Sequence, residues 1–179
     1  MVQIMVHMWY VKKKKKAKPL PLFEKAGVKV TKKVDYVSQL DRVFSRYIRL
    51  RDAFSDGTFM CISCGKIKPL EQADCGHYHS RRHMNTRYDE ENCHAQCRHC
   101  NRMLYGNMVA YSDRLKNKIG QLRFDILALK AVQTKQWTDW ELKELIKHYK
   151  LKCEELEKQK GIKLRIENHS YFTHRGLKP

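Results

Sequence analysis

Two cysteine pairs constrain what this chain can fold into. They are Cys61 with Cys64 and Cys97 with Cys100, in the pattern C-x2-C-x32-C-x2-C. Each pair can present two thiolates from one turn of backbone, and four thiolates complete a tetrahedral zinc shell that leaves no position for water. The cysteine count of 7 is odd, and four of them fall in these pairs. That usage favours metal thiolates in a reducing cytoplasm over a secreted disulfide framework. We therefore expect a structural zinc ion.

A stretch that begins between the two pairs and ends just after the second pair is rich in reactive side chains. Residues 75–102 contain five of the nine histidines and four of the seven cysteines. An insert of 32 residues is longer than a simple zinc ribbon needs, so we expect the zinc ion to hold the base of a structure built within it. Cys75 and Cys93 belong to neither pair. We expect them to be small buried thiols, with metal ligation as the alternative.

The charge of the chain indicates its partner. A formal net charge of +18 over 179 residues exceeds what solubility needs and favours a polyanion, most simply nucleic acid. No long apolar segment accompanies the charge, so we expect no membrane association. Residues 1–34 hold ten lysines and one acid. We expect a flexible basic arm there, which either contacts DNA or only aids solubility. Its candidate DNA contacts are Lys12, Lys13, Lys14, Lys15 and Lys16.

Helical periodicity covers much of the remaining chain. Apolar residues repeat at three- and four-residue steps over 35–54, and Arg42, Arg46 and Arg49 lie on a neighbouring face. These arginines either form an ordinary solvated face or contact phosphates. A second helix is predicted from the second CxxC pair to about Ile119, unless "LYGN" at 104–107 interrupts it. Two more are predicted over 121–132 and 138–159, the last behind a capping box of Thr138 and Glu141.

These elements predict an α+β fold that is mostly α. Residues 1–34 would form the arm, 35–120 a helix with the zinc-containing core, 121–160 the C-terminal helices, and 161–179 a tail. The C-terminal helices carry enough apolar residues either to pack on the core or to form a dimer face.

Three residues around the insert follow the order of a nuclease motif. His77 is followed by Asn92 fifteen residues later and by Asn101 directly after Cys100, and Asn92 opens the pattern N-x4-C-x2-C-N. The order resembles the HNH, or ββα-metal, nucleases. That resemblance implies a zinc-clamped ββα-metal core in which His77 activates water, Asn92 orients a loop and Asn101 binds a catalytic Mg²⁺ or Mn²⁺. Phosphodiester hydrolysis needs both a base near neutrality and a hard cation.

A closer resemblance covers about residues 35–120. The segments "CISCG", "ADCGHYHSRR", "TRYDEENCHAQCRHCNR" and "YGNMVAYSDRL" are similar to the phage lambda NinG family, also called Rap. Membership implies a phage-encoded recombination endonuclease of the host cytoplasm that cleaves branched double-stranded DNA, such as Holliday junctions and D-loops, with recombination proteins among its potential partners. The alternative is a non-catalytic zinc-finger DNA-binding protein acting as a recombination accessory or transcription factor. An RNA-binding zinc protein finds no support in an aromatic RNP-like motif.

The chain departs from the HNH pattern at Gly76. Many HNH enzymes have a metal-binding Asp directly before the histidine, and glycine has no side chain to donate. Asp74, His79 and His94 are the candidates to complete the catalytic-metal site. His94, within "NCHAQC", is favoured over His79 and is also a candidate catalytic residue. In the alternative interpretation, the histidines only face DNA or support the zinc site.

Basic residues surround the proposed centre. Guanidinium forks suit phosphate oxygens, and such contacts position DNA without reading bases, so we expect a preference for DNA shape and strong salt sensitivity. A homodimer would supply two active sites for paired nicks across a junction. The candidate phosphate contacts are Arg81, Arg82, Arg87, Arg98 and Arg102.

Overall fold

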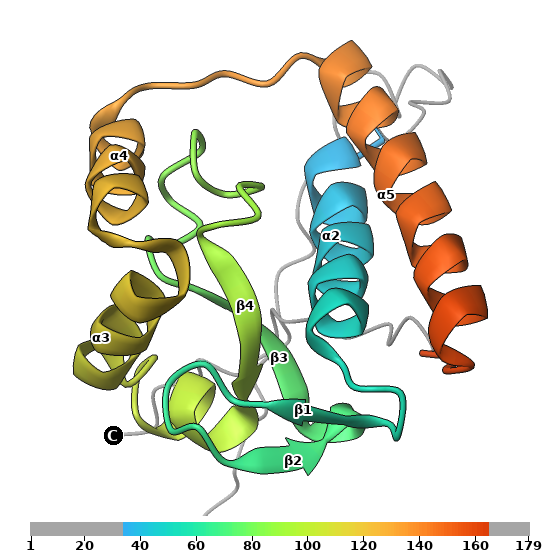
Figure 1. Cartoon of the computed structure of the whole chain (residues 1–179). Helices are drawn as coiled ribbons and strands as arrows, with labels where there is room; N and C mark the ends of the chain where they lie inside the picture. The colour runs from blue at the N-terminus through green and yellow to red at the C-terminus, as the bar shows by residue number, and fades with distance from the viewer. Residues whose placement is uncertain (1–33, 165–179) are drawn as a thin grey trace, which may run out of the picture. The chain divides into compact units, whose positions relative to one another are not determined.

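The computed structural model describes residues 34–164. The predicted lysine contacts and most of the predicted tail therefore lie outside the described residues. The elements are α2 (Tyr36–Asp52), β1 (Thr58–Met60), β2 (Ile67–Pro69), the short 3-10 turn η1 (Leu70–Gln72), β3 (Ala73–His77), β4 (Cys93–Cys97), the π-helical turn η2 (His99–Met103), α3 (Met108–Ile119), α4 (Gln121–Val132) and α5 (Asp139–Lys160). The predicted mixed fold with mostly helical content is confirmed (Figure 1).

Helix α2 begins and ends where its sequence dictates. The Asp35 carboxylate accepts a hydrogen bond from the Ser38 backbone N–H at 3.0 Å, which satisfies a donor that the first helical turn leaves unpaired. After Asp52 the chain turns through Gly57, whose φ of +78° is strained for residues with a side chain. The helix predicted over 35–54 is thus confirmed with a slightly earlier end.

Helix α5 packs along α2 and closes the largest apolar core. Phe44 of α2 meets Tyr149 of α5 edge to face, with ring centroids 4.9 Å apart. The predicted capping box is present: the Thr138 hydroxyl accepts from the Glu141 backbone N–H at 3.2 Å, and the Glu141 carboxylate accepts from the Thr138 N–H at 2.8 Å. One of the two predicted alternatives, packing of α5 on the core, is thus present, while Trp140 and Leu151 of this helix stay exposed and the dimer face stays a prediction.

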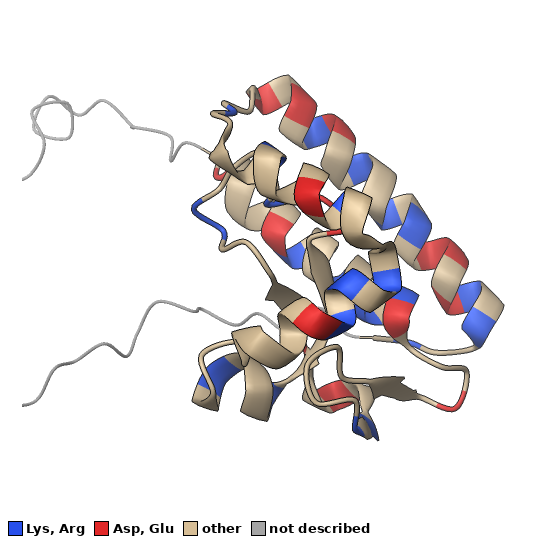
Figure 2. Cartoon of the chain, turned by 60° about the vertical axis from the view of Figure 1, so that its left-hand side comes forward, with Lys and Arg blue, Asp and Glu red and all other residues tan. Residues whose placement is uncertain are grey.

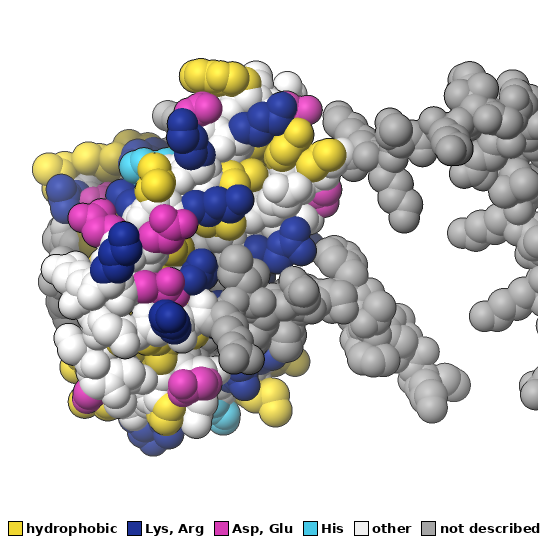
Figure 3. Space-filling model, turned by 90° about the vertical axis from the view of Figure 1, so that its right-hand side faces the viewer, with side chains coloured by type: hydrophobic (Ala, Val, Ile, Leu, Met, Phe, Trp, Pro, Cys, Tyr) yellow, Lys and Arg dark blue, Asp and Glu magenta, His cyan; other side chains and the backbone are white. Residues whose placement is uncertain are grey.

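The outer side of α5 is of mixed charge. Lysines are interspersed with acidic residues along this helix (Figure 2). The face of the molecule seen in Figure 3 likewise mixes basic, acidic and apolar side chains. This helix therefore offers no uniform basic surface.

Two antiparallel hairpins lie between α2 and α3. In the first, β1 pairs with β2, and the first CxxC pair begins the turn between them. In the second, β3 pairs with β4 so that His77 lies opposite Cys93, Gly76 opposite His94 and Asp74 opposite Gln96. Side chains alternate between faces along a strand. Cys75 and Cys93 point toward α2 and join its core. The opposite face of the hairpin carries Gly76 and lies toward α3, where the Tyr111 hydroxyl donates to the Gly76 carbonyl.

The helix predicted from the second CxxC pair to about Ile119 is interrupted. Residues 99–103 form the single turn η2, and α3 starts only at Met108. Between them the backbone is left-handed at Tyr105, Gly106 and Asn107, with φ of 48°, 91° and 44°. An α-helix cannot continue through positive φ values, so the interruption at "LYGN" is confirmed and the continuous helix is wrong.

Helices α3 and α4 share a small core of their own. Tyr111, Leu115 and Leu127 are fully buried there. Helix α4 also leaves an exposed apolar stripe at three- and four-residue steps, made of Leu122, Ile126, Leu129 and Val132. Across residues 34–164, none of the helices has both the length and the apolar character required to cross a membrane.

Candidate metal centre and nucleic-acid interface

Four thiols converge where the two hairpins meet. The Sγ atoms of Cys61, Cys64, Cys97 and Cys100 all lie within 4.8 Å of one another, and those of Cys64 and Cys97 are 4.0 Å apart. In a tetrahedral zinc site with Zn–S bonds of about 2.3 Å, neighbouring sulfurs are roughly 3.8 Å apart. The four cysteines therefore fit a metal ion such as zinc, as their spacing predicts.

Local backbone and side-chain donors arrange the thiols. The turn after Cys61 closes with the Gly65 N–H donating to the Cys61 carbonyl at 2.9 Å, and Gly65 has a φ of +68°. The Cys97 N–H donates to Cys61 Sγ at 3.3 Å, and Asn107 Nδ2 donates to Cys100 Sγ at 3.7 Å. Burial raises the pKa of the Cys100 thiol to about 12. A bound cation would supply the charge that a thiolate needs there.

A carboxylate, an amide and a guanidinium meet beside the thiols. Asp74 of β3 accepts from Asn101 Nδ2 at 2.9 Å and from Arg102 Nε and Nη2, each at 2.7 Å. Burial acts to raise the pKa of the Asp74 carboxyl, but the bonds from Arg102 and Asn101 outweigh it and the pKa is lowered. The carboxylate is therefore charged at neutral pH. Two of the predicted candidate metal ligands, Asp74 and Asn101, are thus brought together.

Steric crowding explains why position 76 holds a glycine. A Cβ built on Gly76 would lie 2.4 Å from Oε1 and 2.8 Å from Cβ of Gln96. Gln96 is held in that position, because its Nε2 donates to Ser63 Oγ at 2.6 Å and to the Gly106 carbonyl at 2.5 Å. An Asp at position 76 would not fit against this side chain. On the same face of β3, Asp74 supplies a carboxylate two residues earlier.

His77 lies on the other face of the hairpin. Its Nε2 is 3.1 Å from the Arg87 carbonyl and its Nδ1 is 3.3 Å from the Cys75 carbonyl. Burial and the charge of Arg81 lower the pKa of His77 to about 4, so the ring is neutral at pH 7. Both ring nitrogens thus face backbone carbonyl oxygens, so the nitrogen that carries the N–H donates to one carbonyl while the other nitrogen holds the lone pair that a base needs. Strand alternation nevertheless puts this ring on the face opposite to Asp74.

His77 shares that face with two thiols. One ligand atom each from Cys75, His77 and Cys93 fall within 4.8 Å of one another. The donor types suit a soft metal ion, but among residues 34–164 no fourth histidine, cysteine or acidic side chain belongs to the group. Cys93 is fully buried and Cys75 is half-buried against the α2 core, which agrees with their predicted role as small core thiols.

Asn92 ties together the two ends of the loop between β3 and β4. Its Oδ1 accepts from the His79 N–H at 2.7 Å, and its Nδ2 donates to the His79 and Thr86 carbonyls, each at 2.9 Å. The side chain is fully buried. This geometry matches the loop-orienting role expected from the sequence.

The other histidines do not join Asp74 and Asn101. His94 lies on the Asp74 face but packs against Tyr111, with ring centroids 6.3 Å apart. Burial and the charge of Lys118 lower the pKa of His94 to about 3, and its Nδ1 has no hydrogen-bond partner among the described residues. The His79 ring meets Tyr78 edge to face, with centroids 4.9 Å apart. Neither ring is hydrogen-bonded to the Asp74 cluster.

Three of the arginines predicted to contact DNA are used within the fold. Arg46 pairs with Glu157 of α5 at 2.5 Å, and Arg49 is buried. Arg87 forms an ion pair with Asp41 at 2.5 Å. These three side chains are therefore engaged within the fold, and phosphate contact at these positions stays a prediction. Four others, Arg42, Arg81, Arg82 and Arg98, have exposed side chains.

A charged cluster at the end of α2 could not be foreseen from residue spacing. Asp52 accepts from Arg51 Nε at 2.8 Å and from the Ala95 N–H at 2.7 Å, and Lys118 of α3 lies 3.9 Å away. Neighbouring Arg and Asp residues occur on many helices. Lys118 lies far from Asp52 in the sequence, so the contact between them becomes visible only in the folded chain.

A family model described as Bacteriophage Lambda NinG protein matches residues 10–159. The chain belongs to the NinG family. Among curated relatives, protein ninG of Escherichia phage 933W is 32% identical over 127 residues, which cover 70% of this chain and 60% of the relative. Protein ninG of Escherichia phage lambda is 31% identical over 127 residues, covering 70% and 59% of the two chains.

The ninG protein of Salmonella phage P22 is 32% identical over 126 residues. The matched part of this NinG-family chain spans about 60% of the length of the phage 933W and lambda relatives. No solved structure matches the chain. The family resemblance read from the CxxC, GHYH and CRHCN segments is confirmed.

Proposed function

We propose that this NinG-family protein is a metal-dependent endonuclease of phage recombination that cleaves branched double-stranded DNA. The observation that carries the proposal is the contact of Asp74 with Asn101 at 2.9 Å, beside four thiols that fit zinc. Carboxylate and amide oxygens are ligands of Mg²⁺ and Mn²⁺, which retain waters and take further oxygens from a phosphate substrate.

In this proposal the two metal sites have different roles. A zinc ion on the four cysteines would fix the start of η2 against β4, and thereby hold Asn101 against Asp74. A Mg²⁺ or Mn²⁺ ion at Asp74 and Asn101 would offset charge on the phosphorane and on the leaving 3′ oxygen. The ion would replace the charge that Arg102 supplies to Asp74 in this structure, and the Asn101 amide would turn its oxygen toward the ion.

The assignment of the general base rests on the resemblance to HNH nucleases. His77 is neutral, as a base must be. Its ring would need to turn from the Cys75 and Cys93 side to reach a water near Asp74. Asn92 would keep the loop that follows His77 in place through its three hydrogen bonds. Exposed arginines at 81, 82 and 98 would contact phosphates.

The test is cleavage of a labelled four-way junction and of a linear duplex of the same sequence, by zinc-loaded protein with Mg²⁺, Mn²⁺ or chelator. We expect metal-dependent cleavage that favours the junction and is lost in His77→Ala and Asp74→Asn. The matched control is Asp113→Asn, which changes an exposed carboxylate on α3 and should leave the rate unchanged.

A different result would support the second class of function. Tight junction binding without cleavage under any of these ions would indicate a non-catalytic zinc-containing DNA-binding protein. Cleavage that survives Asp74→Asn would contradict the proposed metal site even if the protein is a nuclease.

A further inference from the structure

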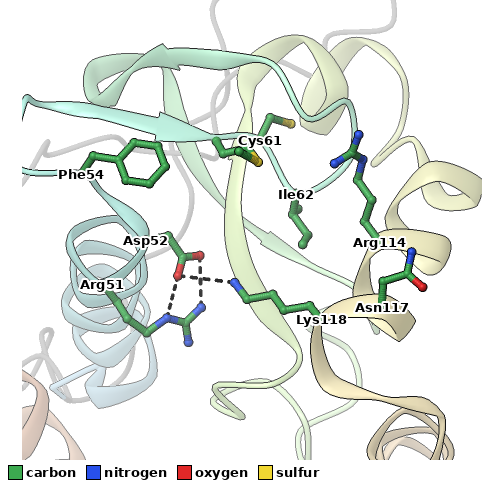
Figure 4. A pocket seen from close by; sticks show the side chains of 9 residues that line it. Arg51, Asp52, Phe54, Cys61, Ile62, Arg114, Asn117 and Lys118 are labelled. Carbon is green, nitrogen blue, oxygen red and sulfur yellow. Dashed lines mark hydrogen bonds and ion pairs between the residues drawn. The ribbon is translucent and has the colours of Figure 1, made fainter.

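A cavity of about 610 Å³ lies on the side of the thiol cluster where α2 ends and α3 passes. Its walls come from three elements: the end of α2, the strand and turn that carry Cys61, and one face of α3 (Figure 4). The volume falls within the range of small-molecule sites, roughly 300–1,000 Å³. Among its lining residues are Asp52, Phe54, Met60, Arg114, Asn117 and Lys118.

The charges lining this cavity leave an excess of cations. The Asp52 carboxylate is already satisfied, because it accepts from Arg51 Nε at 2.8 Å and from the Ala95 N–H at 2.7 Å. Arg51 in turn donates to the carbonyls of Glu90 and Cys93 at 2.9 and 2.8 Å. The acid and the guanidinium therefore neutralise each other, and their hydrogen bonds are directed into the protein.

Two further cations are less fully compensated: Lys118 has only a long contact with Asp52, and Arg114 has no acidic partner among residues 34–164. Lys118 Nζ lies 3.9 Å from Asp52 Oδ1. The same oxygen accepts a closer contact from Arg51 Nε. The Arg114 guanidinium lies over Gly65 of the CxxCG turn, where an added Cβ would come within 2.3 Å of it. Burial outweighs the effect of Asp52 and lowers the pKa of Lys118. An anion beside these two side chains would offset that cost.

The opposite wall of the cavity is apolar and open to solvent. The Phe54 side chain is 43% exposed and Met60 is 48% exposed, although both lie beside a well-packed core. Asn117 adds an exposed amide that can donate and accept hydrogen bonds. A ligand that fills the cavity must therefore combine an anion with a flat or apolar group and polar edges.

We propose that this cavity binds one nucleoside phosphate unit, with the phosphate between Lys118 and Arg114 and the base against Phe54 and Met60. Aromatic stacking and a positively charged phosphate contact are the general means of holding an unstacked nucleotide. The unit is either a nucleotide of a DNA strand or a free mononucleotide. The choice of a deoxynucleotide rests on the proposed function, whereas binding in the cavity does not require cleavage.

The first experiment is calorimetric titration of the full-length, zinc-loaded protein with dAMP, inorganic phosphate and deoxyadenosine, without Mg²⁺ or Mn²⁺. We expect dAMP to bind at least about tenfold more tightly than either fragment, and Lys118→Met and Arg114→Gln each to weaken it by about tenfold. Phe54→Ala should weaken dAMP but leave phosphate unchanged. The control is Arg123→Gln, an exposed cation of α4 outside the cavity.

The second experiment separates the two sources of nucleotide. A junction with 2-aminopurine beside the branch should gain fluorescence on binding when one base leaves the stack, and Phe54→Ala should abolish the gain. Binding of dAMP without any fluorescence gain would assign the cavity to a free mononucleotide.

Equal affinity for phosphate and dAMP, or dAMP affinity that Lys118→Met and Arg114→Gln leave unchanged, would overturn the proposal, as would no binding of dAMP and no fluorescence gain. Variants are compared only when their zinc content and far-UV circular dichroism match the parent. If dAMP binds as expected but the junction is not cleaved, the nuclease proposal is contradicted and the nucleotide-binding proposal is not.

Discussion

Asn92 is expected to be the most stabilising polar side chain of the loop between β3 and β4. It is fully buried and makes three hydrogen bonds to backbone groups, at 2.7, 2.9 and 2.9 Å. Replacement by Ala removes all three. At a net value of about 1 kcal/mol each, the loss is about 3 kcal/mol, and the unpaired buried backbone groups raise it to roughly 3–5 kcal/mol. A domain of this size is stable by only about 5–15 kcal/mol.

The assay is urea unfolding of the zinc-loaded protein, followed by far-UV circular dichroism. Asn92→Asp should cost at least as much as Asn92→Ala, because it would turn a buried carboxylate toward the carbonyls of His79 and Thr86. Asn117→Ala is the matched control, since Asn117 is exposed and such surface changes fall within about 0.5 kcal/mol.

Hydrogen exchange gives a second, local measurement. The His79 N–H donates to Asn92 Oδ1, so its protection should fall in Asn92→Ala by more than that of amides in α5. A loss of less than about 1 kcal/mol in the free energy of unfolding, with unchanged protection of the His79 amide, would refute the view that Asn92 holds this loop.

Four further predictions follow from the same contacts. Gly76→Ala should lower the free energy of unfolding by about 1–3 kcal/mol through overpacking, and by clearly less in a Gln96→Gly background, which removes both the Oε1 and the Cβ that the new methyl group would meet; equal losses in both backgrounds would argue against that contact. Cys97→Ser should lower the zinc content, measured by plasma mass spectrometry, from about one ion per chain, and unchanged zinc would exclude this cysteine as a ligand. His94 should make stability depend on pH: its ordinary pKa is 6.5 and its folded value is about 3, so the unfolded chain takes up the proton first. Its contribution is fully present above pH 6.5 and is lost as the pH falls toward 3, by an amount on the order of a few kcal/mol; urea unfolding of His94→Gln should show a flatter slope over that window, and an unchanged slope would mean that His94 is not the group responsible. If the exposed stripe of α4 joins two copies of the chain, light scattering after size exclusion should show a dimer that Leu129→Glu converts to a monomer, and a monomeric parent would exclude this interface.

The parts of the fold that depend on local patterns were predictable from the sequence. The start of α2 at Asp35, the capping box at Thr138 and the helix end at Gly161 are each decided by a few adjacent residues. The four cysteines could be assigned to one cluster because a CxxC turn determines its own geometry. The interruption after η2 was the harder case, since glycine and asparagine in "LYGN" permit a left-handed backbone without requiring it.

Contacts between distant segments could not be read from spacing. Three arginines look like free cations in the sequence. In the fold, Arg46 pairs with Glu157, Arg87 pairs with Asp41, and Arg49 is buried. The order of His77 and Asn101 does not reveal that strand alternation separates their faces. Likewise, the absence of an Asp at position 76 is explained only by Gln96, which occupies the space above that glycine.

The central claim is that a hard divalent ion binds at Asp74 and Asn101, separately from the ion on the four cysteines. The most direct measurement is anomalous diffraction from crystals of zinc-loaded protein soaked in Mn²⁺, with data collected at the zinc and manganese edges. We expect a zinc peak among Cys61, Cys64, Cys97 and Cys100, and a manganese peak at Asp74 that disappears in Asp74→Asn. A manganese peak located instead at Cys75, His77 and Cys93, or no manganese peak at all, would contradict this claim.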